Sequence, residues 1–141
     1  MTSLKFATAL HTLLLLAHMK ADAPLRAMAS RTLAGSIGAN PVVVRRILAQ
    51  LMAAGLVQTR SGSYGGAWLT RPASQIALSE IYTAVDEPAG PGTRQDCNHK
   101  CPVGRAAPKA IAALLGQMQQ AAEAVLAEQT LADMLARLED V

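Results

Sequence analysis

Aromatic residues are scarce in this chain: one Trp, two Tyr and one Phe make up 3% of its 141 residues. The apolar content, 51% of the sequence, therefore consists mainly of Ala and Leu. Both are strong helix formers, so we expect a mainly helical protein. This apolar fraction is enough to build a core and argues against wholesale disorder. No repeat of solenoid length is present, and the length favours one domain with room for a dimerisation appendage.

Long apolar runs are also missing. No stretch approaches the ~20 apolar residues of a membrane-spanning helix. The N-terminal segment loosely mimics a signal peptide, but His11 and Thr12 interrupt its apolar run. His18 and Lys20 then lie where a cleavage region is small and neutral. The apolar spacing instead predicts an amphipathic helix over residues 3–18, so we expect a cytoplasmic protein with no membrane partner.

Acidic residues are nearly absent from the first half of the chain. Residues 1–75 contain eight Lys or Arg and one acid, Asp22, for a net charge of +7. Residues 76–141 carry a net charge of −4. Such asymmetry indicates that the first half meets a polyanion, although chance segregation of solvated charge is the alternative.

A short helix, a turn and a second helix are predicted between residues 30 and 54. Ser30 is a candidate N-cap for a helix over 31–37, and Gly38 ends that helix. Asn40 is a favoured N-cap for the next helix, with Pro41 at its first position. The inward face of this second helix is apolar and consists of Val44, Ile47, Leu48 and Leu51. The arrangement is that of a helix-turn-helix.

The opposite face of the second helix combines two arginines with small residues: Val42, Arg45, Arg46 and Ala49. Such a face can enter the major groove of DNA without steric conflict. An ordinary solvated helix with two surface arginines is the alternative.

A β-hairpin is predicted directly after these helices. Alternating residues over 56–60 and a return strand over 67–70 flank a glycine-rich turn. A hairpin in this place is a wing, and its glycines allow close approach to a phosphate backbone and entry into the minor groove. The candidate DNA-binding residues are Arg31, Asn40, Pro41, Val42, Arg45, Arg46, Arg60, Ser61, Gly62, Ser63, Tyr64 and Gly65.

The rest of the chain is predicted to be helical apart from one loop. A helix over 78–86 precedes a Pro/Gly-rich loop, and a long helix starts at about Arg105 with Pro108 in its first turn. Thr130 and Asp133 resemble a capping box for a last helix over 131–138. The long helix has an apolar seam suited to pairing with a second copy: Ile111, Leu114, Leu115, Met118, Ala121, Ala122, Val125 and Leu126. We therefore divide the chain into a DNA-binding domain (1–86), a cysteine-containing sensor loop (87–104) and a dimerisation region (105–141).

Cys97 and Cys101 are the only cysteines, with His99 between them. Their spacing matches neither a C-x2-C redox site nor a repeated zinc-finger pattern. A thiol beside Lys100 near a helix start is a candidate for oxidation and thus for redox sensing. Two ordinary loop cysteines without a sensing role are one alternative. Metal or iron–sulfur ligation by Cys97, His99 and Cys101 is another.

Several stretches together resemble the bacterial winged-helix repressors of the IscR/NsrR/CymR type, the Rrf2 family. They are residues 33–46, 54–57, 62–67 with 69–70, 81–85 and 101–104. The resemblance implies a homodimer, with a winged helix-turn-helix and a long dimerisation helix, that regulates and usually represses genes of redox, nitrosative, sulfur or iron–sulfur stress. The cluster-binding branch of the family has three cysteines in the loop, where this chain has two. Cys101 lies where other members also carry a cysteine.

The sequence thus predicts a mainly α, winged helix-turn-helix transcription regulator rather than an enzyme. It would bind double-stranded DNA at a palindromic operator as a homodimer. An iron–sulfur regulator of the same fold and a non-specific DNA-binding protein are the alternatives. A thiol-dependent oxidoreductase would need a base and a pocket beside the cysteine, and the sequence offers no such catalytic set. We assign no certain cofactor.

Overall fold

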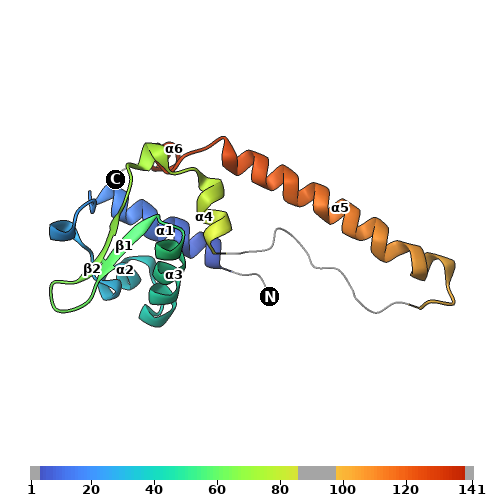
Figure 1. Ribbon diagram of the computed structural model, residues 1–141, viewed down its shortest axis with the longest axis horizontal. Coiled ribbons are helices and arrows are strands. Elements are labelled where there is room, and N and C mark those ends of the chain that lie inside the picture. The colour runs from blue at the N-terminus through green and yellow to red at the C-terminus, as the bar shows by residue number, and fades with distance from the viewer. Residues whose placement is uncertain (1–3, 86–97, 139–141) are drawn as a thin grey trace. The chain divides into compact units, whose positions relative to one another are not determined.

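The computed structural model describes residues 4–85 and 98–138. It divides the chain into two units, Met1–Glu87 with Leu126–Val141, and Pro88–Val125. In chain order the first unit contains α1 (Lys5–His18), the short 3-10 helix η1 (Pro24–Arg26), α2 (Ser30–Ile37), α3 (Pro41–Ala53), β1 (Val57–Arg60), β2 (Gly66–Leu69), the 3-10 helix η2 (Ala73–Gln75), α4 (Leu78–Ala84) and α6 (Leu131–Ala136) (Figure 1). The second unit is mostly α5 (Pro102–Ala127). The mainly helical fold with a two-stranded antiparallel wing and a long C-terminal helix confirms the predicted class.

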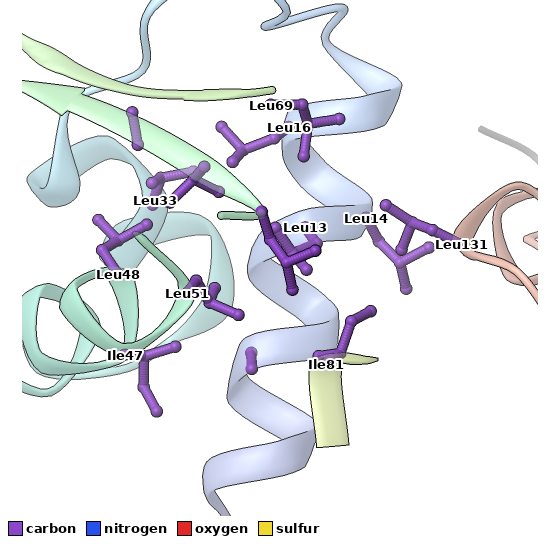
Figure 2. Close-up of a cluster of buried hydrophobic side chains, with 14 of the residues drawn as sticks. Leu13, Leu14, Leu16, Leu33, Ile47, Leu48, Leu51, Leu69, Ile81 and Leu131 are labelled. Carbon is purple, nitrogen blue, oxygen red and sulfur yellow. The ribbon is translucent and has the colours of Figure 1, made fainter. Parts of the chain in front are cut away.

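The core of the first unit is built around α1. Leu13 and Leu16 on one side of this helix are fully buried. They point toward apolar side chains that come from α2, α3, β2 and α4, as Figure 2 shows. Because these side chains come from the helix-turn-helix, the wing and α4, one core holds the helix-turn-helix and the wing in place.

The last helix, α6, also belongs to the first unit. Leu131 is fully buried in the core, and its N–H donates to the carbonyl of Ile76 over 2.8 Å. The N–H of Leu78 donates in turn to the carbonyl of Gln129 over 2.9 Å. The sequence groups this helix with the dimerisation region, whereas the helix packs beside α1. The functional division into DNA-binding, sensor and dimerisation segments stays a prediction.

The starts of α5 and α2 differ from those predicted, and α1 begins at Lys5 instead of residue 3. The long helix begins at Pro102 instead of Arg105 and contains Pro108 in its interior. Its first turn forms earlier because the N–H of Arg105 already donates to the carbonyl of Cys101 over 3.0 Å, and a proline suits the first helical position. Similarly, α2 begins at Ser30 with Ala29 as its N-cap, so the predicted capping role of Ser30 is wrong.

Two predicted caps are confirmed. Asn40 Oδ1 accepts a hydrogen bond from the N–H of Val42 over 2.8 Å at the start of α3. Thr130 Oγ1 accepts from the N–H of Asp133, whose carboxylate accepts from the N–H of Thr130. Both caps satisfy backbone groups that a helix start leaves without an intrahelical partner. In the part of the chain that the structure describes, no helix combines the length and the apolarity needed to cross a membrane.

Candidate nucleic-acid interface

The two faces of α3 have opposite character, as the sequence predicts. Val44, Ile47, Leu48 and Leu51 are buried, whereas the side chains of the other face are exposed. On that outer face, neither Arg45 nor Arg46 forms an ion pair with any residue of 4–85 or 98–138. Two guanidinium groups are thus exposed to a ligand on α3, which is held in place by the Asn40 cap and by its buried apolar face.

The turn that orients α3 depends on Gly38. This residue has φ +76°, a left-handed conformation that side chains with a Cβ rarely adopt. It ends α2 and lets the chain reverse before Asn40 caps α3. The local sequence therefore sets the angle at which the outer face of α3 is presented.

The wing is a regular hairpin. β1 and β2 pair antiparallel, with Val57 opposite Leu69 and Arg60 opposite Gly66. Leu69 and Ala67 point into the core, whereas the tip from Ser61 to Tyr64 is exposed. The tip is therefore carried at a fixed place relative to α3.

Met28, in the segment between η1 and α2, pairs with the edge of β2 that does not face β1. The N–H of Met28 donates to the carbonyl of Ala67 over 2.9 Å, and the N–H of Ala67 donates back over 2.9 Å. This approach is so close that a Cβ on Gly66 would lie 2.4 Å from the Met28 carbonyl oxygen. The bridge also explains the start of α2, because it holds the chain extended as far as Ala29.

A groove of about 380 Å³ lies between α3, the start of α2 and the wing. It brings together several predicted site residues that are distant in sequence, namely Arg45, Arg60, Ser61, Gly62 and Gly65. Ser63 and Tyr64 line a second groove, which also contains Arg60 and Gly65. The other predicted residues, Arg31, Asn40, Pro41, Val42 and Arg46, line neither groove.

Sequence reasoning missed one segment of this surface. Ala29 and Ser30 line the first groove, and Pro24 and Leu25 line the second. Nothing in the local sequence marks these residues as part of the interface, because only the pairing of Met28 with the distant Ala67 brings them to the wing.

Arg60 does not simply project into solvent. Its Nη2 atom donates to the carbonyl oxygen of Tyr64 over 3.2 Å and to that of Pro24 over 3.4 Å. The guanidinium thus links the wing tip to η1, and it leaves other N–H groups for a ligand.

The charge of this surface suits a polyanion. The only acidic residue among residues 1–75, Asp22, forms an ion pair with Arg26. Arg71 pairs with Glu80 outside this segment, whereas Arg45 and Arg46 form no ion pair with any described residue. A surface of this sign attracts phosphates at long range and raises association rates.

The predicted sensor residues are only partly described. Cys97 lies outside the described residues. Cys101 is half-buried at the start of α5, where its carbonyl accepts from the N–H of Arg105. Within residues 4–85 and 98–138, no three His, Cys, Asp or Glu side chains are placed to hold a metal ion. An iron–sulfur cluster is commonly held by four cysteine thiolates, and one chain carries two, so its own cysteines do not fit such a cluster.

A helix-turn-helix with two exposed arginines on its second helix, followed by a hairpin wing, defines the winged helix-turn-helix class of DNA-binding transcription regulators. The model of the Rrf2 family, described as an iron-dependent transcriptional regulator, matches residues 2–137. The chain belongs to this family, which confirms the resemblance seen in the sequence. It is therefore a transcriptional regulator and not an enzyme.

Individual relatives agree with this assignment. YwnA of Bacillus subtilis (strain 168), which bears the name of an HTH-type transcriptional regulator, is 34% identical over 110 residues, covering 77% of this chain and 82% of YwnA. The structure of a protein from Lactobacillus plantarum, described as a transcriptional regulator, superposes with a TM-score of 0.76 at 27% identity, covering 97% of this chain and 91% of that one. CymR of Staphylococcus aureus shares the fold, with a TM-score of 0.69 at 23% identity, covering 99% of this chain and 100% of CymR.

Proposed function

We propose that the protein is a homodimeric repressor that binds a palindromic operator in double-stranded DNA. The observation that carries the proposal is the exposed outer face of α3, where Arg45 and Arg46 have no acidic partner among the described residues. An arginine fork matches the O6 and N7 acceptors of guanine in the major groove. The wing beside α3 would then contact the phosphates and the adjacent minor groove. A partner of this kind would place the protein in the cytoplasm.

The homodimer is supported by the apolar seam of α5. None of the 26 residues of this helix is buried, and Leu114 and Val125 are each 56% exposed. Apolar positions spaced by three and four residues over several turns are typical of helices that pair with another helix. A twofold dimer would present two copies of α3 to two half-sites about one helical turn apart, which matches a palindrome.

Selection from random duplex DNA tests the sequence-specific function. The wild-type protein should enrich a palindromic sequence and bind it far more tightly than random duplex at the same salt concentration. Arg46→Ala should weaken operator binding by ~1–3 kcal/mol, or roughly 5- to 150-fold. Arg105→Ala removes the same charge from α5 and is the matched control, for which we expect little change. Equal affinity for selected and random DNA would contradict the proposal and favour a non-specific DNA-binding protein.

We also propose that Cys101, together with Cys97, makes operator binding sensitive to oxidants. Cys101 supports this proposal by its place at the start of α5, where a modified thiol would disturb the first turn of the seam-bearing helix. Protein purified without air should be colourless and should lose operator affinity reversibly on mild oxidation. The Cys101→Ser variant should bind the operator, but its affinity should no longer fall on mild oxidation. Stoichiometric iron and sulfide would instead indicate a cluster shared between chains, and indifference to oxidant would contradict the thiol switch.

A further inference from the structure

Two large side chains near the wing are almost fully exposed. Leu25 in η1 is 96% exposed and Tyr64 at the wing tip is 89% exposed. Single exposed apolar residues are ordinary, whereas exposed apolar surface that gathers in a groove is typical of interaction sites. Both residues line the same groove, which has a volume of about 520 Å³.

A single guanidinium holds the two sides of this groove together. Arg60 Nη2 donates to the carbonyl of Tyr64 itself and to that of Pro24, the residue before Leu25. The Met28–Ala67 bridge ties the same two segments a few residues away. The backbone segments that carry Leu25 and Tyr64 are thus linked to each other, although the sequence separates the two residues widely.

The pair continues the surface that faces DNA in the proposed function. Its groove shares Ala29, Arg60 and Gly65 with the groove beside α3. The surrounding half of the chain carries a net charge of +7. An apolar pair within a basic surface suits a ligand that is both anionic and partly apolar. Duplex DNA is such a ligand, because its phosphates are anionic whereas the sugars and base steps of its minor groove offer apolar surface.

We infer that Leu25 and Tyr64 form an apolar wedge that contacts the minor groove of the operator, and that Arg60 is a positioning residue that holds this wedge. The inference rests on the proposed DNA-binding function and adds η1 to the interface. Apolar side chains that press between base steps in the minor groove give binding energy that depends on DNA deformability rather than on phosphate charge. Their contribution should therefore be insensitive to salt.

Operator affinity measured as a function of salt concentration tests the wedge. Leu25→Ala and Tyr64→Ala should each weaken binding by roughly tenfold, from the apolar contact that is lost. The slope of log affinity against log salt should not change, because no phosphate contact is removed. Tyr64→Phe should retain wild-type affinity, since the ring and not the hydroxyl makes the contact. Met19→Ala, at an exposed apolar position outside both grooves, should leave affinity unchanged.

Arg60→Met separates positioning from direct phosphate contact. If Arg60 holds the wedge, the variant should lose affinity with an unchanged salt slope, and adding Leu25→Ala should cost little more. A slope reduced by about one would make Arg60 a phosphate ligand and contradict its positioning role.

Two outcomes distinguish failure of the wedge from failure of the proposed function. If the wild-type protein selects no DNA sequence, the proposed function fails, and the wedge fails with it. If the wild type binds its operator but Leu25→Ala and Tyr64→Ala bind equally well, only the wedge is wrong. A changed oligomeric state in these variants with unchanged DNA affinity would likewise overturn the wedge and identify a protein contact.

Discussion

Arg71 and Glu80 connect the end of the wing to the start of α4. Arg71 Nη2 donates to Glu80 Oε1 over 2.8 Å, and Glu80 Oε2 accepts from the N–H of Ala77 over 2.9 Å. The hydrogen bond from Arg71, followed by that from Ala77, lowers the pKa of Glu80 below its ordinary value of 4.5. The Glu80 carboxylate therefore caps the start of α4 and, through Arg71, links this helix to the base of the wing.

This lowered pKa predicts a loss of stability in acid. Because the folded state binds the Glu80 proton more weakly than the unfolded state, the carboxylate stabilises the fold fully above about pH 4.5 and loses this contribution as the pH falls through the folded pKa. The pair is partly exposed, so the effect should be modest. Urea unfolding of wild type and Glu80→Gln from about pH 7 to about pH 3 should show two curves that converge as the pH falls. Arg71→Met removes the main cause of the lowered Glu80 pKa and should also flatten the dependence of stability on pH. If the curves of wild type and Glu80→Gln stay parallel, Glu80 is not the source of this dependence.

The cap of α3 predicts separate effects on stability and DNA binding. Asn40→Ala removes the acceptor for the Val42 N–H and should destabilise the protein by ~0.5–2 kcal/mol in urea unfolding. Asn40→Asp keeps an acceptor at this position and should retain stability. It also adds a negative charge at the start of the proposed recognition helix, so operator binding should fall nonetheless. Unchanged operator binding by this aspartate variant would place the start of α3 away from DNA.

The helix-turn-helix could be predicted because its signals are local. Asn40 and Pro41 mark the start of α3, and the spacing of its apolar residues fixes which face is buried. The same reasoning placed Arg45 and Arg46 outward, as the structure has them. Caps and periodicity act within one or two helical turns, so a single sequence records them.

The missed features depend on contacts between distant segments. The Met28–Ala67 bridge sets the start of α2 and brings Leu25 to the wing, yet neither residue has a distinctive local pattern. Similarly, α6 joins the first unit through the buried Leu131 and its backbone bond to Ile76. Its capping box predicted that a helix would form, but a cap contains no information about where a helix packs.

The close approach of Met28 to Gly66 predicts that replacing this glycine destabilises the protein. Gly66 has φ +149°, and a Cβ there would lie 2.4 Å from the Met28 carbonyl oxygen. Gly66→Ala should therefore destabilise the protein by about 1–3 kcal/mol and weaken operator binding, since the bridge that positions the wing must shift. Gly35→Ala is the matched control, because a Cβ at this position of α2 meets nothing within 4 Å. A helical alanine there should be neutral or stabilise by up to about 1 kcal/mol, as thermal and urea unfolding would show.

The proposed dimer predicts that one charge on the α5 seam separates the protomers. Leu114 is 56% exposed within a single chain, and in a paired helix Leu114→Glu would bury a carboxylate without a partner. Sedimentation should show a dimer for the wild type and a shift toward monomer for this variant. Gln120→Glu introduces the same charge on the other side of the helix and should remain dimeric.

Operator binding then shows whether dimerisation serves DNA recognition. The Leu114→Glu variant should bind a single half-site about as well as the wild type but lose its preference for the full palindrome, because its two copies of α3 are no longer linked. Its melting temperature should also lose the dependence on protein concentration expected of the wild-type dimer. If the variant stays dimeric, the seam is not the interface. If it becomes monomeric yet binds the palindrome with full affinity, dimerisation through α5 is real but plays no part in reading the operator.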